Sequence, residues 1–331
     1  MPARSLQFSI TEKIWPLKQA FRISRGSRTE IHVLVLTVND GTYTGRGEAV
    51  TSKRYNEDIP SATDRLNRVF DQIPFEATPQ DIQSLLPASA ARNALDCALW
   101  DLQAKRSGKR VWDLANITVS SSALTAFTIS LNPPAKMAAD ARENRAAPIL
   151  KLKLGGDDAD LARVEGVRQA APEARLIIDA NESWSPLHYR SIVPPLTQLG
   201  VELIEQPFAE AKDNVLKDLE RPIPVYADES CHTSADLTRL KPLYEGVNIK
   251  LDKTGGLTEA LNLAIRAGEM GFKILIGSMV GTSLGMAPAR LLADRAQYLD
   301  LDGPLLLARD EPHPLKYEHG NIGLPSPDLW G

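Results

Sequence analysis

Residues 148–156 read PILKLKLGG, an apolar run that alternates with lysine and ends at two glycines. Similar short runs return as RLIIDAN at 175–181, VELIEQP at 201–207, VYADES at 225–230 and VNIK at 247–250. Stretches with helical spacing separate these runs, which is typical of repeated βα units around parallel strands. The polar residues that end eight such runs lie roughly 25 residues apart and are Thr128, Lys153, Asp179, Glu205, Asp228, Lys250, Ser278 and Asp300. This spacing favours an α/β barrel of the (β/α)₈ type over an open doubly wound sheet, with the chemistry at the carboxyl ends of the strands.

The residues before these runs follow a different pattern. Residues 6–50 alternate apolar and polar positions around a turn at Asn39, Asp40 and Gly41, so we expect an antiparallel meander there. The stretch SAARNALDCALWDLQAKRSG at 89–108 has the spacing of a helix. We therefore expect three parts: an α+β domain at 1–119, a barrel at 120–309, and a proline-rich tail at 310–331 that packs back across the first domain.

Composition excludes several classes of protein. The chain has 331 residues, with 38 Lys and Arg against 42 Asp and Glu, and it carries no basic run that could follow a phosphate backbone, so nucleic acid is not expected as a partner. Cys97 and Cys231 have neither disulfide nor zinc-site spacing, which indicates a reducing compartment. No apolar run approaches the roughly 18 residues of a membrane span, and we expect a cytoplasmic protein.

Three carboxylates end consecutive apolar runs, at Asp179, Glu205 and Asp228. Adjacent parallel strands would place them side by side, where they would repel one another unless a cation lay between them. Mg²⁺ takes oxygen ligands and keeps positions open for water and substrate, so we predict a magnesium site. Taken singly, each acid could equally be a helix cap or a surface ion pair.

Lysines are expected on both sides of this site. The period of two places Lys151 and Lys153 on one strand face, and Lys250 ends a strand across the barrel axis. A neutral lysine can remove the α-proton of a carboxylate bound to Mg²⁺, and a second lysine can return it on the opposite face. We assign Lys153 and Lys250 as the two bases, and Lys151 as the electrostatic partner of the substrate carboxylate.

The remaining candidates are predicted to bind the substrate. Asp300 and Asp302 in YLDLDGP share a strand face and suit an ammonium ligand, although a loop cap is the alternative. Arg25 or Arg28, in the first domain, could offer a guanidinium to a distal carboxylate. Three further residues complete the set: Thr128 and Ser278 as pocket residues, and Asn181 as a support for the metal ligands.

The motifs KLK, DAN, EQP, ADES and NIKLDKTGG occur in this order, with RNALDCALWDL at 92–102 before them. In these motifs the chain resembles the enolase superfamily, specifically the muconate-lactonizing-enzyme subgroup, and within it the L-Ala-D/L-Glu dipeptide epimerases. The resemblance implies an α+β capping domain on a (β/α)₇β barrel, that is, a modified TIM barrel. It also implies one Mg²⁺ per subunit and a homo-oligomer.

The resemblance also implies roles for individual residues. The chain would epimerise the C-terminal residue of L-Ala-D/L-Glu, a dipeptide derived from murein, through an enediolate. Asp300 and Asp302 match the pair that holds the α-ammonium of the dipeptide, and Arg25 matches the arginine that contacts the glutamate side chain.

Other functions remain open at this point. An o-succinylbenzoate synthase, a cycloisomerase or an N-acylamino acid racemase would share the metal and the lysines, but their substrates have no ammonium for Asp300 and Asp302 to bind. An epimerase for a different dipeptide would keep every feature. A Schiff-base aldolase would not need three carboxylates, and a non-catalytic scaffold would not need acids and lysines together in a barrel mouth.

Overall fold

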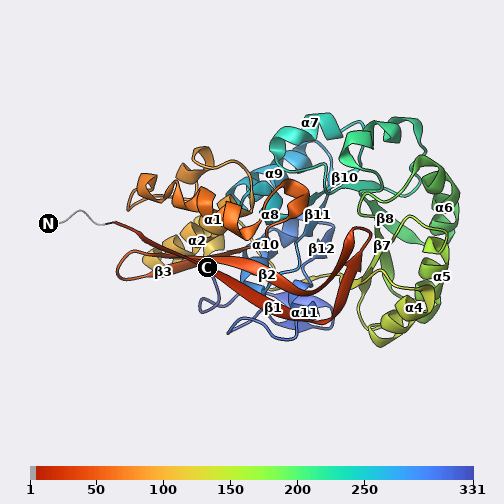
Figure 1. Ribbon diagram of the computed structural model, residues 1–331, viewed down its shortest axis with the longest axis horizontal. Coiled ribbons are helices and arrows are strands. Elements are labelled where there is room, and N and C mark those ends of the chain that lie inside the picture. Colours follow the sequence, from red (N-terminus) through yellow and green to blue (C-terminus); the bar gives the residue numbers. More distant parts are fainter. Residues whose placement is uncertain (1–4) are drawn as a thin grey trace.

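The computed structural model describes residues 5–331 and contains a parallel barrel with an N-terminal capping domain (Figure 1). The cap begins with an antiparallel sheet in the order β1-β2-β3, as the alternation of residues 6–50 predicts. Its strands are β1 (Gln7–Ile23), β2 (Gly26–Asn39) and β3 (Thr44–Ala49). The turn between β1 and β2 reaches the mouth of the barrel, where the Ser24 hydroxyl donates to the Asn181 carbonyl at 3.1 Å.

Helices cover one face of the cap sheet. Helix α2 (Ala90–Ser107) begins at Ser89, whose hydroxyl accepts from the Arg92 amide, and ends at Gly108, which has a positive φ of 67°. These are the expected N-cap and C-cap chemistries, and they confirm the helix predicted over 89–108. The cap also contains α1 (Ile59–Asn67), α3 (Val111–Leu114) and the 3₁₀ turns η1 (Lys53–Tyr55), η2 (Phe70–Gln72) and η3 (Asp81–Ser84).

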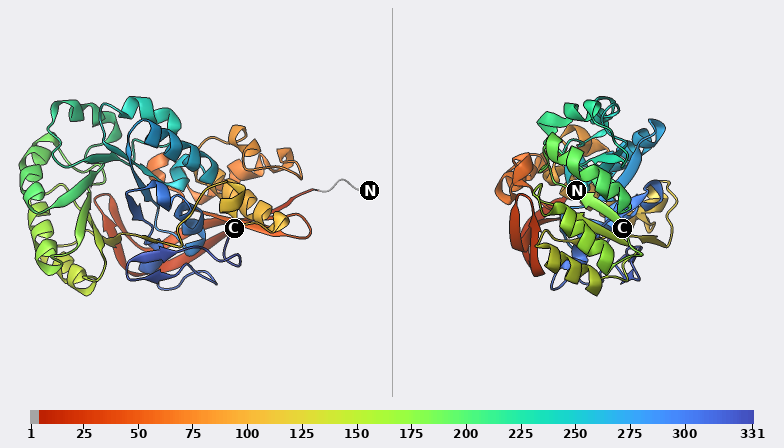
Figure 2. Two further views of the ribbon diagram at one scale, coloured as in Figure 1. Left: turned by 180° about the vertical axis from the view of Figure 1, so that it is seen from behind. Right: turned by 90° about the vertical axis from the view of Figure 1, so that its right-hand side faces the viewer.

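Eight parallel strands form the barrel in sequential order, and Figure 2 shows helices along its outer side. The strands are β5 (Phe127–Ile129), β6 (Ile149–Lys153), β7 (Arg175–Asp179), β8 (Val201–Glu205), β9 (Val225–Ala227), β10 (Gly246–Ile249), β11 (Lys273–Gly277) and β12 (Tyr298–Asp300). The intervening elements are α4 (Pro134–Glu143), α5 (Asp160–Ala170), α6 (Pro186–Gln198), η4 (Glu210–Asp218), η5 (Ser234–Asp236), α7 (Leu237–Leu240), α8 (Leu251–Thr254), α9 (Leu257–Glu269), α10 (Ser283–Arg290) and η6 (Ala293–Arg295). The barrel nearly closes, because the Ala126 amide donates to the Leu299 carbonyl at 2.8 Å across the gap between β5 and β12.

The two faces of β6 differ as the period of two predicts. Leu150, Leu152 and Leu154 lie outside the barrel in the large core beneath the helices. Ile149 points inward and packs in a separate apolar cluster that fills the lower barrel. Its partners there are Ala126, Ile177, Leu203, Tyr226 and Leu275. The inward positions nearer the carboxyl end are lysines, so the interior changes from apolar to charged along the barrel axis.

The C-terminal residues connect the barrel to the cap. After α11 (Gly303–Leu306), the strands β13 (Tyr317–Glu318) and β14 (Asn321–Gly323) form a small antiparallel sheet with β4 (Ser122–Leu124). The chain end then contacts α2, where the Trp330 indole donates to the Cys97 carbonyl at 3.0 Å. No helix between residues 5 and 331 has the length and apolar character needed to cross a bilayer.

Candidate active site

The predicted polar residues meet at one end of the barrel, because the strand register aligns their positions. Lys153, Asp179 and Glu205 are the last residues of β6, β7 and β8, and they lie side by side in the register of these strands. Asp228, Lys250 and Ser278 each follow a strand by one residue, and Asp300 ends β12. Thr128 lies within β5, one residue before its end.

The three predicted metal ligands form one compact group. Carboxylate oxygens of Asp179, Glu205 and Asp228 all lie within 4.8 Å of one another. All three side chains are buried. This is an all-oxygen donor set of the kind that a hard divalent cation prefers.

The lysines around the carboxylates determine which acids are charged. Burial raises the pKa of Asp179, but Lys153 and Lys151 reverse this effect and hold the pKa below its usual value. Lys250 and Lys253 do the same at Asp228. At Glu205, burial and the neighbouring Asp179 prevail and raise the pKa to about 7.

The two proposed bases contact different members of the predicted metal-ligand group. Lys153 Nζ lies 2.5 Å from Asp179 Oδ2, and Lys250 Nζ lies 2.6 Å from Asp228 Oδ2. Burial lowers the pKa of Lys250, but the charges of Asp228 and Glu205 more than offset this and raise it above its usual value. The lysines therefore approach the acid group from β6 and β10, on two sides.

Lys151 is fully buried beneath the acid group. Its Nζ lies 2.6 Å from Asp300 Oδ2, 2.7 Å from Glu205 Oε2 and 3.3 Å from Asp179 Oδ2. Burial lowers the pKa of Lys151, but these three acids raise it well above its usual value. Lys151 thus links the triad to the end of β12.

Asp300 and Asp302 are held together by β5. The Thr128 amide donates to Asp302 Oδ2 at 2.6 Å, and its hydroxyl donates to Asp300 Oδ1 at 3.4 Å. Burial and the nearby Asp300 raise the pKa of Asp302 to about 7. The Ser278 hydroxyl donates to the Asp300 carbonyl at 3.3 Å, so the pair lies directly behind Ser278.

A cavity of about 520 Å³ lies between the cap and the barrel mouth. Several predicted residues line it, namely Arg25, Arg28, Lys153, Asn181, Asp228, Lys250 and Ser278. Thr128 instead lines a separate hollow of about 110 Å³. Neither Lys151 nor the two acids Asp300 and Asp302 line either space. The two lysines assigned as bases therefore face one cavity, whereas the predicted ammonium ligands lie behind its wall.

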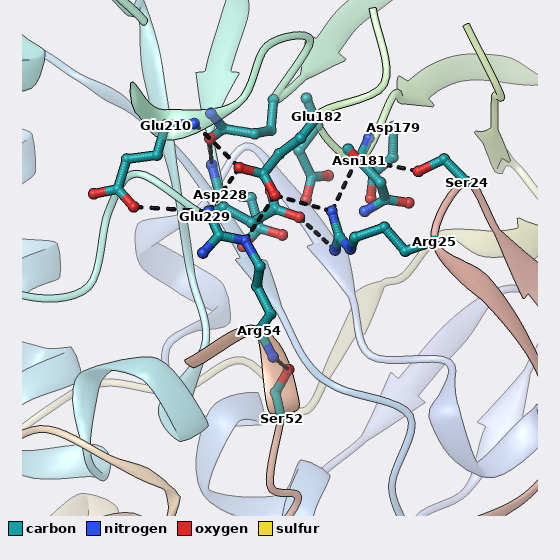
Figure 3. Close-up of polar contacts among 12 residues, drawn as sticks. Ser24, Arg25, Ser52, Arg54, Asp179, Asn181, Glu182, Glu210, Asp228 and Glu229 are labelled. Carbon is teal, nitrogen blue, oxygen red and sulfur yellow. Dashed lines mark hydrogen bonds and ion pairs between the residues drawn. The ribbon is translucent and has the colours of Figure 1, made fainter. Parts of the chain in front are cut away.

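Arg25 reaches from the cap to the barrel (Figure 3). Its guanidinium donates to Glu229 Oε1 at 2.7 Å, to the Asn181 carbonyl at 2.8 Å and to Glu182 Oε2 at 3.2 Å. Burial lowers the pKa of Arg25, but Glu229 above all raises it beyond its usual value. Arg28 also lines the cavity, and within residues 5–331 it has no ion pair or side-chain hydrogen bond.

Sequence reasoning missed several residues that support the site. Lys253 is fully buried and donates to Asp228 Oδ1 at 2.7 Å and to the Asn248 carbonyl at 3.0 Å. The Asn248 amide donates to Glu205 Oε1 at 2.7 Å. The period of two that selected Lys250 also selects Asn248, and Lys253 is one helical turn beyond Lys250 in NIKLDKTGG. Both signals were present in the sequence.

Asn181 contacts Asp179, one of the predicted metal ligands, through its backbone. Its amide donates to Asp179 Oδ1 at 2.9 Å, and its own side-chain oxygen is buried without a hydrogen-bond partner. Gln206 plays a similar part at the next strand, because its Oε1 accepts from the Asp228 amide at 2.9 Å. These contacts fix the orientation of the carboxylates before any ligand binds.

A parallel barrel with a buried acid triad between lysines, covered by an α+β cap, defines a class of barrel enzymes whose acid triad suits a divalent cation. Comparison with protein families agrees with this class. Residues 5–115 match the mandelate racemase / muconate lactonizing enzyme N-terminal domain, and residues 135–327 match the enolase C-terminal domain-like family. The chain belongs to the mandelate racemase / muconate lactonizing enzyme family of the enolase superfamily.

Individual relatives narrow the class further. The chain is 43% identical over 301 residues to N-acetyl-D-glutamate racemase of a Pseudoalteromonas species, covering 90% of this chain and 95% of the relative. It is 41% identical over 317 residues to L-Ala-D/L-Glu epimerase of Escherichia coli K12, covering 95% of this chain and 98% of the relative. The chain is thus an isomerase of the epimerase and racemase type.

Solved structures of relatives contain ligands. An enolase family member from Agrobacterium tumefaciens with homology to dipeptide epimerases, solved with sodium and L-Ala-L-Glu, has a TM-score of 0.96 and 45% identity, covering 98% of this chain and 100% of its own. The dipeptide epimerase of Cytophaga hutchinsonii, solved with Mg and D-Ala-L-Val, has a TM-score of 0.91 and 25% identity, covering 98% and 94% of the two chains.

Proposed function

We propose that this protein is a Mg²⁺-dependent epimerase that inverts the α-carbon of the C-terminal residue in L-Ala-D/L-Glu. The observation that carries the proposal is the placement of Lys153 and Lys250, which contact two different carboxylates of one triad and face one cavity. Inversion of a carbon centre needs one group to remove a proton and another to return it from the opposite side. Two lysines on separate strands meet this requirement.

The residues present fit the metal. Asp179, Glu205 and Asp228 would hold Mg²⁺ with one oxygen each, and the remaining ligand positions would be open to water and the substrate. When bound, the ion would stabilise the negative charge of the enediolate and so acidify the α-proton. With the ion bound, the charges of Asp228 and Glu205, which raise the pKa of Lys250, would be partly neutralised, so Lys250 would lose its proton more readily.

The lysines would carry out the proton transfer. One neutral lysine removes the α-proton of the C-terminal residue, and the other, protonated, donates a proton to the opposite face of the same carbon. Reversal of the two roles converts the other diastereomer. Lys151 would remain charged among its three acids and contribute positive potential beneath the substrate carboxylate.

We propose that Asp300 and Asp302 attract the α-ammonium of the first residue. They lie behind Ser278, a cavity residue. Among residues 5–331, the Thr128 amide donates to Asp302, whereas the Thr128 hydroxyl and Lys151 donate to Asp300. An ammonium at this position would complete the hydrogen bonds of two buried carboxylates. It would also favour the charged form of Asp302.

The glutamate side chain requires a cation on the cap side of the cavity. The resemblance assigns this role to Arg25, whose guanidinium is already bound to Glu182 and Glu229. Arg28 and Lys53 also line the cavity, and neither has an ion pair among residues 5–331. We propose that Arg28, assisted by Lys53, binds the distal carboxylate, and that Arg25 fixes the β1–β2 turn next to Arg28.

Racemisation of N-acetyl-glutamate is the second candidate, because a relative of that activity is 43% identical to this chain. The same triad and lysines would serve both reactions. The difference lies at Asp300 and Asp302, since an N-acetyl group offers a neutral amide where the dipeptide offers an ammonium. A neutral Asp302 could donate a hydrogen bond to the acetyl oxygen.

The test compares the two substrates under one set of conditions. L-Ala-L-Glu, other L-Ala-L-Xaa dipeptides and N-acetyl-D-glutamate are incubated with the protein and Mg²⁺ in D₂O, and the α-proton is followed by NMR. We expect exchange and the L,D diastereomer with L-Ala-L-Glu, both abolished by EDTA. Exchange confined to N-acetyl-glutamate would establish the second candidate. Exchange confined to other dipeptides would reject the glutamate assignment alone.

A further inference from the structure

The turn after β7 has an unusual backbone. Asn181 and Glu182 follow the metal-ligand candidate Asp179 and have φ values of 43° and 66°. Two consecutive residues other than glycine in the left-handed region are rare, and such conformations persist only where the surrounding contacts determine them. Here they direct the Glu182 side chain toward the cap, and the Glu182 amide donates to the Gln206 carbonyl at 2.8 Å.

Glu182 contacts both cap loops at once (Figure 3). Arg54 donates to it through Nε and Nη2, each at 2.8 Å, which is a bidentate arrangement. Arg25 Nη1 donates to the same carboxylate at 3.2 Å, and the Glu210 amide donates at 3.1 Å. Although burial raises the pKa of Glu182, the hydrogen bonds from Arg54 and Glu210 hold it below its usual value.

Among residues 5–331, no other acid binds both Arg25 and Arg54. Glu229 pairs with Arg25 alone, and the Glu210 carboxylate lies 3.8 Å from Arg54, beyond hydrogen-bond distance. The Glu182 side chain is also far more buried, with 9% of its surface exposed against 40% for Glu210. Charge-assisted bidentate pairs are stronger than neutral hydrogen bonds and also fix the relative orientation of the two groups.

The two loops and the start of β2 carry the charged cap residues that line the cavity. Arg25 lies in the turn between β1 and β2, Arg28 is the third residue of β2, and Lys53, Arg54 and Tyr55 form η1. A contact that holds both loops against the β7 turn therefore sets the position of every charged cap group that faces the cavity.

We propose that Glu182 is a positioning residue that closes the β1–β2 turn and the η1 loop over the substrate cavity by binding Arg25 and Arg54 together. The inference rests on the proposed function for its kinetic consequence. Its structural consequence, the closed state of the two loops, is independent of any substrate. Because Glu182 lies three residues after Asp179, the closing contact and the metal site share one turn of the barrel.

Trypsin provides a test that needs no activity. Arg28, at the start of β2, and Lys53, in η1, are cleavage sites next to the two contacts, and neither residue contacts Glu182. We expect Glu182→Gln to accelerate cleavage after both residues by about tenfold or more, mapped by mass spectrometry of the folded protein. The matched control is Glu210→Gln, which removes an acid of the same cluster and should leave both rates unchanged.

A second variant separates the two loops and protects the test against a folding defect. Arg54→Met breaks only the η1 contact, so cleavage after Lys53 should rise while cleavage after Arg28 stays slow. If cleavage is accelerated at sites throughout the chain, and not only after Arg28 and Lys53, the variant is generally unfolded. That result would contradict a local opening of the two loops in this variant. Unchanged cleavage after Arg28 and Lys53 in Glu182→Gln would overturn the proposal.

Kinetics then test the consequence for the reaction. With L-Ala-L-Glu we expect Glu182→Gln to raise KM about tenfold or more and to change kcat less, because the loops bind substrate but do not transfer protons. An unchanged KM together with open loops would overturn the role in the reaction. If Glu182→Gln is cleaved faster at both sites but the wild type exchanges the α-proton of no substrate, the proposed function is rejected. The role of Glu182 in holding the two loops would still stand.

Discussion

Lys153 and Lys250 approach the acid group from β6 and β10, and each pairs with a different carboxylate. If each lysine serves one face of the α-carbon, removing one should abolish epimerisation but not all proton exchange. We expect Lys153→Ala and Lys250→Ala each to lower epimerisation by about 10³-fold or more. In D₂O each variant should exchange the α-proton of only one diastereomer, and the two variants should exchange opposite ones.

The readout is NMR of the separate L,L and L,D dipeptides. Exchange of both diastereomers by a single-lysine variant would contradict the assignment of one lysine to each face. Lys212→Ala is the control, because Lys212 is an exposed residue of η4 and should leave both exchange rates unchanged.

Lys253 is a structural counterpart of the two bases. Its ammonium donates to the Asp228 carbonyl, to Asp228 Oδ1 and to the Asn248 carbonyl. All three N–H groups of this buried side chain therefore have an acceptor. Removing one member of a buried pair typically costs about 3–5 kcal/mol, because the partner charge stays buried. Since Asp228 keeps Lys250, we expect Lys253→Met to lower the free energy of unfolding by about 3 kcal/mol.

Urea denaturation with EDTA present measures this change. The exposed Lys212→Met should stay within about 0.5 kcal/mol of the wild type. A Lys253→Met protein as stable as the wild type would show that desolvation of the ammonium offsets its three hydrogen bonds.

The positions of residues at the carboxyl ends of the barrel strands are what the sequence predicts best. In a parallel barrel each buried strand is short and apolar, so the first charged residue after it marks the mouth, and Asp179, Glu205 and Asp228 could be placed together for that reason alone. The alternation in β6 likewise predicts which residues point inward. These inferences need only local periodicity and a common strand direction.

The cap side of the cavity could not be predicted in the same way. The contacts of Arg25 depend on two consecutive left-handed residues after β7 and on where a long hairpin ends, and no local period encodes either. Glu182 therefore looks like an ordinary loop acid in the sequence. The Thr128 contacts were missed for a related reason, because they cross the seam between the first and last barrel strands.

The contact between β3 and α2 depends on glycine. A Cβ at Gly47 would lie 2.1 Å from the Ala94 carbonyl oxygen, and a Cβ at Gly45 would lie 2.1 Å from that of Ala98. Backbone atoms of a helix cannot move aside as a flexible side chain can. We expect Gly47→Ala to lower the free energy of unfolding by about 3 kcal/mol, at the upper end of typical overpacking costs.

Gly268 provides a control of opposite sign. It is an exposed residue of α9, and a Cβ there would meet nothing within 4 Å. Gly268→Ala should therefore stabilise the protein by about 0.5–1 kcal/mol, since alanine loses less backbone entropy in a helix. Urea midpoints of the two variants give both signs, and equal effects would contradict the close approach of α2 to β3.

On the scale of the whole molecule, buried acids join the cap to the barrel. Glu48 of β3 accepts from the Thr282 amide at 2.8 Å and from its hydroxyl. Asp96 of α2 accepts from the Thr258 amide at 3.1 Å. Here the acid belongs to the barrel and the donor to the cap: Asp252 of α8 accepts from the Val50 amide at 3.0 Å. Burial raises the pKa of Glu48 to about 8 and that of Asp96 and Asp252 to about 7.

Because these pKa values are raised in the folded protein, we expect the stability of the folded protein to fall as pH rises. A carboxyl group whose pKa is higher in the folded chain binds more protons there than in the unfolded chain, so stability falls as pH rises from the unfolded to the folded pKa. For Glu48 this window runs from its ordinary value near 4.5 to about 8. Between about pH 5.5 and 8 the loss from Glu48 alone would be about 3 kcal/mol, at about 1.4 kcal/mol per pH unit.

Glu48→Gln tests this origin, because the amide keeps the oxygen that accepts from the Thr282 backbone but does not titrate. We expect the variant to lose less stability than the wild type between about pH 5.5 and 8, with the difference between the two proteins changing by about 3 kcal/mol across that range. Urea denaturation at a series of pH values measures the difference in free energy of unfolding between the two proteins. The contributions of acids that both proteins share cancel in this difference. A difference independent of pH would mean that Glu48 is ionised at the cap interface, with Thr282 stabilising the carboxylate. Glu48 belongs to the cap, and its partner Thr282 directly precedes α10 in the barrel. The same measurements therefore show whether the protonated form of Glu48 stabilises the contact between cap and barrel.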